Sequence, residues 1–189
     1  MATRLARGVR DRARSRAAQA DVMAVTYAIY LIRHGIAEER SDAWPDDAKR
    51  PLTDDGTQKM RKAARGLERL GVRFDAILTS PFVRARQTAD LVAAAYDQRP
   101  PVVTMDSLAP GGSIQSVLTD LERQNRRSRV ALVGHEPGIG ELAARLAGAR
   151  YPIEFKKGAV CRIDVKTFPA GPGKLRWFMT TKVLRAIKK

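Results

Sequence analysis

One stretch of the sequence constrains the fold more than any other: an unbroken apolar run that leads into an arginine, a histidine and a glycine. Residues 29–32 read Ile-Tyr-Leu-Ile and are followed directly by Arg33, His34 and Gly35. A short apolar run that ends at a turn residue is typical of a strand buried on both faces, as in a parallel sheet. In open α/β sheets the ligand crevice lies at the carboxyl ends of the strands, so Arg33 and His34 are expected at such a crevice. The alternative is a strand end that exposes two polar residues to water.

The residue types at this strand end suit phosphate chemistry. Arginine supplies planar, bidentate donors that match phosphate oxygens. Histidine can act as a nucleophile or a proton carrier near neutral pH. Gly35 would let the backbone turn tightly beside a ligand.

Strand-like and helix-like patterns alternate along the chain. After the first strand, apolar runs predict strands at residues 74–79, 102–105 and 130–133. Helical spacing of apolar residues predicts helices at residues 54–70, 83–96, 114–121 and 138–147. Strands that alternate with helices predict an α/β fold of three layers, with a mostly parallel central sheet and helices on both of its faces.

The C-terminal part of the chain has a different pattern. Residues 159–165 and 175–180 alternate in polarity on either side of a turn rich in proline and glycine. This pattern predicts an antiparallel hairpin at the edge of the sheet. Near the other end of the chain, the polar residues 37–50 are predicted to form a loop. Thr53 is expected to cap the helix that follows this loop, and Gly71 to end it.

The first 22 residues differ in composition from the rest. Residues 1–22 hold six arginines, two aspartates and almost no large apolar side chains. They are predicted to be a basic, disordered tail, and residues 23–189 a single α/β domain. The tail lacks the apolar segment of a secretory signal, and Met23 is an alternative start of the chain. The tail could also contact nucleic acid or an acidic surface.

Charge and cysteine content limit the function classes. The formal net charge is +15, which favours anionic partners such as phosphorylated molecules. Aromatic residues make up only 6% of the chain and are scattered, so a nucleic-acid partner is not expected. The single cysteine, Cys161, excludes an internal disulfide and a cysteine metal site, which agrees with a cytoplasmic protein. No apolar run approaches membrane-spanning length, so no membrane association is expected.

Both histidines of the chain follow buried-type strands. His34 follows the first strand and His135 follows the strand at residues 130–133, and each has a glycine beside it. A third strand ends at Ser80, and Arg84 follows four residues later. The carboxyl ends of parallel strands share one edge, so two histidines and two arginines, counting Arg33, are expected to meet there.

Several other kinds of site do not fit these residues. A zinc site needs three or four ligands, and two histidines flanked by arginines make a poor cation site. The sequence has no P-loop, no dinucleotide-binding glycine pattern after the first strand and no G-x-S-x-G serine motif. A pocket rich in cationic donors suits a tetrahedral phosphoryl group, with histidine as the nucleophile. The nearby arginines would also disfavour protonation of the imidazole rings.

Four motifs, in order along the chain, resemble the histidine phosphatase superfamily, which includes the phosphoglycerate mutases. They are Leu-Ile-Arg-His-Gly at 31–35, Pro-Leu-Thr-x-x-Gly at 51–56, Ser-Pro-Phe-x-Arg-Ala-x-Gln-Thr at 80–88 and Val-Gly-His at 133–135. The resemblance covers residues 27–165 and is greatest to the short SixA-type phosphohistidine phosphatases.

The resemblance implies a catalytic role for each residue at this edge. His34 would take the phosphoryl group covalently, and Arg33, Arg84 and His135 would bind the phosphate and stabilise the transition state. Gly35 would allow close approach of the backbone to the substrate. No metal or other cofactor is implied.

The chain departs from the larger members of the superfamily in one respect. Those proteins place an acidic proton donor on an inserted helical region, whereas residues 107–112 here contain no carboxylate. Asp106 is nearby, but strand geometry can point it elsewhere, and Glu136 is interpreted as a loop residue. The SixA-type proteins resemble this chain in lacking both the insert and the acid.

Three hypotheses about function remain open at this stage. The first is a phosphatase that acts through phosphohistidine, on phosphohistidine in proteins. The second is a phosphatase of small phosphoesters, nucleotides or polyphosphate. The third is a basic binding module that keeps the fold without the reaction. The intact set of His34, Arg33, Arg84 and His135 favours an enzyme.

Overall fold

A computed structural model describes residues 26–124, 126–167 and 172–188. The predicted tail, residues 1–22, lies outside the described residues, so the division into a tail and one domain stays a prediction. Among the described residues, no helix is long and apolar enough to cross a membrane.

The described residues form one six-stranded sheet with the order β3-β2-β4-β1-β5-β6. The strands β1 to β4, which pair in parallel, are Tyr27–Arg33, Ala76–Thr79, Val102–Thr104 and Arg129–Gly134. The remaining two, β5 and β6, are Val160–Val165 and Lys174–Met179. β5 runs antiparallel to β1 and β6 runs antiparallel to β5 at the edge, which confirms the predicted mostly parallel sheet with a C-terminal hairpin.

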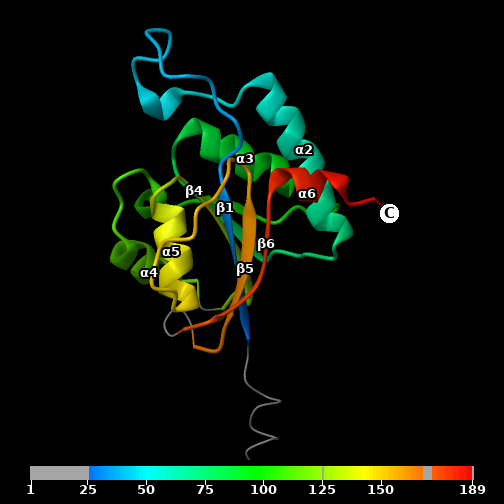
Figure 1. Cartoon of the computed structure of the whole chain (residues 1–189), viewed down its shortest axis with the longest axis vertical. Helices are drawn as coiled ribbons and strands as arrows, with labels where there is room; N and C mark the ends of the chain where they lie inside the picture. Colours follow the sequence, from blue (N-terminus) through cyan, green and yellow to red (C-terminus); the bar gives the residue numbers. More distant parts are fainter. Residues whose placement is uncertain (1–25, 125, 168–171, 189) are drawn as a thin grey trace, which may run out of the picture.

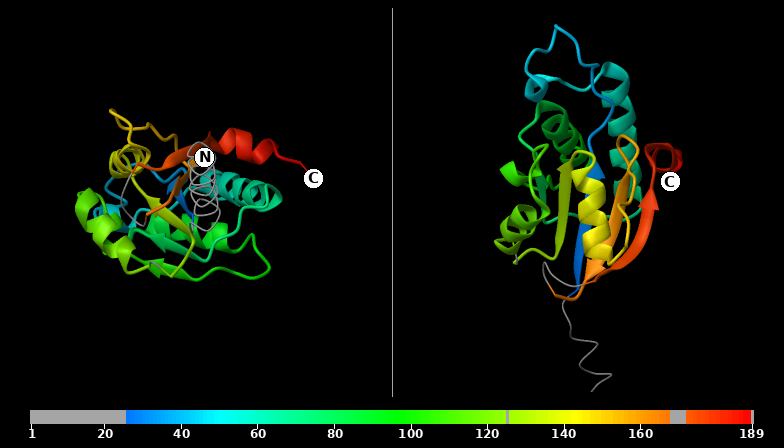
Figure 2. Two further views of the ribbon diagram at one scale, coloured as in Figure 1. Left: turned by 90° about the horizontal axis from the view of Figure 1, so that it is seen from below. Right: turned by 60° about the vertical axis from the view of Figure 1, so that its left-hand side comes forward.

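Helices cover both faces of this sheet (Figures 1 and 2). The longer helices are α2 Asp54–Arg69, α3 Val83–Ala93, α4 Ile114–Glu122 and α5 Gly138–Ala147, and α6 is the short helix Thr181–Ala186. α2, α3 and α6 pack on the face that carries Tyr30 and Ile32, whereas α4 and α5 pack on the face that carries Ile29 and Leu31. Neighbouring residues of β1 point to opposite faces, and residues 28–32 are all buried, so the middle of this central strand is a continuous apolar run.

The ends of the first long helix follow the sequence expectations. The Thr53 side chain accepts a hydrogen bond from the backbone N–H of Gly56 at 2.9 Å and so caps α2. Gly71 has a positive φ of 73° just after the helix, a conformation that glycine adopts at little cost. A Cβ on Gly56 would lie 2.1 Å from the carbonyl oxygen of Ile36, so only glycine lets α2 lie this close to the segment after His34.

Some predicted boundaries were wrong. β2 begins at Ala76 rather than residue 74, because Phe74 packs against Tyr30 at 5.0 Å between ring centroids while the Asp75 carboxylate accepts hydrogen bonds from Ser128 and Arg129. The second long helix ends at Ala93, where tight turns replace the helical pattern, instead of continuing to residue 96. The predicted loop at 37–50 contains a 3-10 turn, η1 (Asp47–Lys49), which the Asp46 side chain caps.

Candidate active site

The parallel strands bring their carboxyl ends to one edge of the sheet. The register pairs Arg33 with Gly134 and Thr79 with Val133, so the residues that follow lie side by side. The rings of His34 and His135 are 5.0 Å apart between centroids, and both side chains are buried. The sheet therefore brings together the two histidines that the sequence placed at this edge.

His34 is held with one ring nitrogen engaged and the other free. Its Nδ1 lies 2.7 Å from the carbonyl oxygen of Gly35, which can only accept, so Nδ1 carries the proton and Nε2 keeps its lone pair. The N–H of Gly35 donates to Thr88 Oγ1 at 3.0 Å, which fixes the turn after the strand. A Cβ on Gly35 would lie 2.6 Å from Met60 Cγ, so this position favours glycine on steric grounds.

The two arginines are anchored through their terminal nitrogens. Arg33 Nη1 donates to the carbonyl oxygen of Phe155 at 2.6 Å. Arg84 donates from Nη1 to the backbone oxygen of Asp47 at 2.7 Å and from Nη2 to the carboxylate of the same residue at 2.9 Å. In both arginines the Nε atom is buried and has no hydrogen-bond partner.

His135 also has a buried nitrogen without a partner. Its Nε2 lies 2.8 Å from Ser80 Oγ, while its Nδ1 makes no hydrogen bond. Five buried side-chain polar atoms lack a partner in the described part of the chain, and three of them belong to Arg33, Arg84 and His135. A buried polar group without a partner is costly, and such groups in one place mark a site that awaits a ligand. The Nε–H groups of arginine can only donate, so an anion fits there.

Comparison with known proteins identifies the family of this chain. Residues 29–109 match the family described as "Histidine phosphatase superfamily (branch 1)". An uncharacterised protein of Picosynechococcus sp. strain PCC 7002 is 43% identical over 136 residues, which are 70% of this chain and 81% of that protein. A phosphohistidine phosphatase SixA homolog of Haemophilus influenzae is 31% identical over 71% of this chain and 86% of its own length. The chain belongs to the histidine phosphatase superfamily, in its SixA-type branch.

Two further similarities extend over most of the described chain. Phosphohistidine phosphatase SixA of Escherichia coli strain K12 is 28% identical over 162 residues, which are 85% of this chain and 98% of that protein. A solved structure of the protein histidine phosphatase SixA complexed with tungstate superposes with a TM-score of 0.73 and 27% identity, covering 82% of this chain and 97% of that one. This chain is therefore a phosphatase with the fold of that branch.

Burial keeps both histidines of this histidine phosphatase uncharged. The pKa of His34 is lowered to about 3, mainly by burial and to a smaller extent by the charges of Arg84, Arg33 and Lys157, against the opposing hydrogen bond to Gly35. Burial likewise lowers the pKa of His135 to about 3, with added effects of His34 and Arg84. The sequence predicted neutral imidazoles because of the arginines, but removal from water is the larger cause.

The two buried histidines should make stability depend on pH. Their pKa is about 3 in the folded state and 6.5 in the unfolded state, so between these values the unfolded chain binds more protons. The free energy of unfolding should therefore be unaffected above pH 6.5 and fall as the pH is lowered, by about 1.4 kcal/mol per pH unit for each histidine. Urea denaturation at pH 7.5 and 5.0 measures the change. His135→Gln should halve the loss, and an equal loss in wild type and variant would contradict the assignment.

The sequence analysis missed Asp47. Its carboxylate lies 2.9 Å from Arg84 Nη2, 2.8 Å from Arg50 Nη2 and 3.1 Å from Arg40 Nε. Partial burial would raise its pKa, but the hydrogen bonds from Arg50 and Arg84 outweigh this effect and hold the pKa at about 2. Asp47 is thus a permanent anion that holds Arg84 in place, on the loop that extends beyond the end of β1 (Figure 1). Nothing in the sequence pattern distinguishes it from Asp42 or Asp46.

The structure also places Glu136 and Asp106, the two carboxylates that the sequence analysis considered near the site. Glu136 Oε1 accepts the backbone N–H of Phe155 at 2.7 Å, and the Glu136 carboxylate also interacts with the backbone N–H of Gly140. This supports the interpretation of Glu136 as a loop residue, although burial raises its pKa. Asp106 is exposed and lines a separate hollow with Asp120 and Arg123. Among the described residues, no group of three or more His, Cys, Asp or Glu side chains could hold a metal ion.

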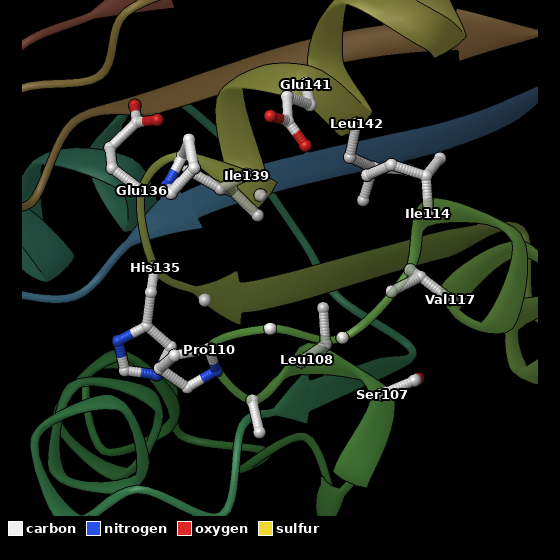
Figure 3. A pocket seen from close by; sticks show the side chains of 16 residues that line it. Ser107, Leu108, Pro110, Ile114, Val117, His135, Glu136, Ile139, Glu141 and Leu142 are labelled. Carbon is white, nitrogen blue, oxygen red and sulfur yellow. The ribbon is translucent and has the colours of Figure 1, made fainter.

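A cavity of about 160 Å³ opens beside His135 (Figure 3). Residues 107–112, the start of α4 and the turn into α5 form its walls. The expectation of a pocket rich in cationic donors is therefore incomplete, because no lysine or arginine among the described residues lines this part of the site.

Proposed function

We propose that this phosphatase removes the phosphoryl group from phosphohistidine in proteins, through a covalent phosphohistidine formed on its own His34. The observation that carries the proposal is that Arg33, Arg84 and His135 lie near His34, and that each has a buried nitrogen atom without a hydrogen-bond partner among the described residues, while Nε2 of His34 keeps its lone pair. A cationic, buried set of donors matches the charge that develops on the oxygens of a transferring phosphoryl group.

The reaction has two steps in this proposal. In the first, Nε2 of His34 attacks phosphorus, the bond to the leaving group breaks, and Arg33, Arg84 and His135 bind the phosphoryl oxygens. The Gly35 carbonyl that accepts from Nδ1–H stabilises the positive charge that arises on the imidazole ring. In the second step, water attacks phosphorus and releases inorganic phosphate, which restores neutral His34.

The nature of the leaving group favours phosphohistidine. An alkoxide needs a proton from a general acid. Residues 107–112 provide no carboxylate, Asp47 and Glu136 are engaged, and Glu141 lies on the α5 wall of the cavity beside His135. An imidazole leaving group can be protonated by water at its other nitrogen, so a dedicated donor matters less. The relatives named phosphohistidine phosphatase SixA support the same substrate class. A phosphorylated protein is the proposed partner, with neither nucleic acid nor a membrane involved, and the expected location is the cytoplasm.

Substrate preference tests this proposal. The value of kcat/KM for a phosphohistidine protein should exceed the values for phosphoserine protein, sugar phosphates, nucleotides and polyphosphate by about a hundredfold or more. A small phosphoester or polyphosphate cleaved more efficiently would favour the second hypothesis. No turnover of any substrate would favour a binding module.

The reaction should not need a divalent metal ion. Arg33 and Arg84 already supply the positive charge that a metal would otherwise bring to the phosphoryl oxygens, and neutral His135 adds an N–H donor. Turnover in excess EDTA should equal turnover without it, within about a factor of two. A loss that added Mg²⁺ or Zn²⁺ restores would show that the site has been misinterpreted.

A further inference from the structure

The cavity beside His135 differs in character from the phosphate site. Its walls are mainly apolar and are formed by Leu108, Pro110, Ile114, Val117, Ile139 and Leu142. Figure 3 shows the His135 ring at one end of the cavity and Ile114 and Val117 at the other. A volume of about 160 Å³ is smaller than the pockets that enclose whole small molecules, and suits one side chain.

The charges around this cavity are negative. Glu136 and Glu141 line it, and no lysine or arginine does so in the part of the chain that the structure describes, although the chain holds 35 of them. Figure 3 places Glu141 on the wall that α5 forms. A second phosphate group directed into this cavity would meet the Glu141 carboxylate and apolar carbon, whereas an aliphatic or cationic group would be favoured.

The cavity shares His135 with the reaction site. His135 lines the cavity, and its ring stands 5.0 Å from the ring of His34 between centroids. A molecule whose phosphoryl group lies against His34 can therefore place a neighbouring group in the cavity. On the basis of the proposed function, we infer that the cavity is a subsite for an aliphatic side chain of the substrate protein close in sequence to the phosphohistidine. Glu141 favours a basic residue beyond that side chain.

Phosphohistidine peptides test the subsite. The peptides carry leucine, glycine or aspartate at one position near the phosphohistidine and are otherwise identical. The KM for the leucine peptide should be lower than the KM for the aspartate peptide by about tenfold or more. Ile114→Trp, at the partly exposed end of the cavity, should remove the preference for leucine by raising KM with little change in kcat. Turnover of para-nitrophenyl phosphate, which has nothing to place in the subsite, should stay within about a factor of two of wild type.

Two further variants keep the test decisive. Val183→Trp places the same indole on the exposed face of α6 and should leave the peptide preference unchanged. Glu141→Lys, at an exposed position, should reverse the preference between basic and acidic flanking residues even if Ile114→Trp does not fold. Equal KM values for the leucine and aspartate peptides in wild type would overturn the subsite and leave the proposed function intact. Turnover of para-nitrophenyl phosphate with no cleavage of any phosphohistidine peptide would overturn both.

A separate observation concerns Ser80, whose side chain is fully buried against His135. Ser80 Oγ lies 3.2 Å from the backbone nitrogen of Phe82 and 2.8 Å from His135 Nε2. The Phe82 N–H can only donate, so it uses an acceptor site of the hydroxyl. The hydroxyl proton then has His135 Nε2 as its acceptor. If Nε2–H donated instead, the Ser80 proton would be buried without an acceptor, at a free-energy cost.

We infer that Ser80 is a positioning residue that holds His135 in the tautomer with its proton on Nδ1. Nδ1 is the ring nitrogen that is buried without a partner, so in this tautomer it donates to a phosphoryl oxygen. The other tautomer would direct a lone pair at that oxygen and repel it. Ser80 therefore determines whether the second histidine of the chain binds the anion.

Nitrogen NMR can observe this tautomer directly, because the chain contains only two histidines. In protein labelled with ¹⁵N-histidine at pH 7, His135 should show a protonated Nδ1 and an unprotonated Nε2, with His34→Gln used for assignment. Ser80→Ala should shift the spectrum towards protonated Nε2 and weaken competitive inhibition by inorganic phosphate about tenfold. Ser80→Thr should restore the wild-type tautomer.

Thr79→Val is the matched control, because this neighbouring buried hydroxyl donates to the Ser80 backbone oxygen at 3.2 Å instead of contacting the histidine. It should leave the His135 spectrum and the inhibition constant unchanged. A wild-type spectrum with protonated Nε2 would overturn the inference, whatever the variants do. An unchanged spectrum and unchanged inhibition in folded Ser80→Ala would also overturn it.

Discussion

Replacing His34 with alanine is expected to lower turnover by about ten-thousandfold and to abolish covalent labelling of the protein. The reason is that Nδ1–H of His34 is bound to the Gly35 carbonyl, so its Nε2 has a lone pair that no group among the described residues uses. Rapid quenching with ³²P-labelled substrate should leave acid-labile, base-stable phosphate on the wild-type protein and none on His34→Ala.

His135→Ala serves as the control for this experiment. It removes a donor and leaves the nucleophile, so label should still form on His34, though more slowly. Label that survives in His34→Ala, or that disappears only in His135→Ala, would show that the roles of the two histidines are reversed.

The second large effect is expected at Arg84. Arg84→Met should lower kcat/KM by about 10²- to 10³-fold, because a buried N–H donor to the phosphoryl group is lost. Arg84→Lys should restore little of this activity. Arg84 donates to Asp47 from Nη1 and Nη2 and has its Nε–H left for the substrate. A lysine has a single ammonium nitrogen, which cannot bind Asp47 and the phosphoryl group in the same geometry.

Arg86 provides a matched control on the same helix. Its side chain is exposed and pairs with Asp90 at 3.1 Å, so Arg86→Met should keep kcat/KM within about a factor of two of wild type. Steady-state kinetics give kcat/KM for both variants, and inhibition by phosphate gives the inhibition constant for both. Similar losses in the two variants would indicate a general effect of positive charge on binding rather than a contact made by Arg84.

The meeting of the two histidines at one edge of the sheet, which the sequence predicted, follows from strand geometry. Residues in a buried parallel strand are apolar on both faces, so the strand is recognised in the sequence as a stretch of consecutive apolar residues. The end of that stretch marks the end of the strand. His34 and His135 stand directly after such runs, and the sheet register then brings their rings together. To predict that the two histidines meet, the local sequence pattern is enough once it is assumed that parallel strands place their carboxyl ends at one edge of the sheet.

The part that could not be predicted depends on contacts between distant segments. Asp47 lies in a loop with no hydrophobic period, and its pairing with Arg84 depends on how that loop folds over α3. Arg33 is held by the Phe155 carbonyl, 122 residues away. The bond between Ser80 and His135 Nε2 likewise joins two strand ends, and residue type alone does not say which ring nitrogen is used. The sequence therefore predicts which side chains meet, and the tertiary structure decides which of their atoms stay free.

The position of β3 has a consequence for how such proteins diverge. This strand is only three residues long and lies at the edge of the sheet, and the loop after it forms one wall of the cavity. Residues inserted into that loop would extend away from the strands, so they would not disturb the register that aligns the two histidines. A descendant gene could thus acquire a different substrate through this one loop and inherit the phosphoryl chemistry unchanged.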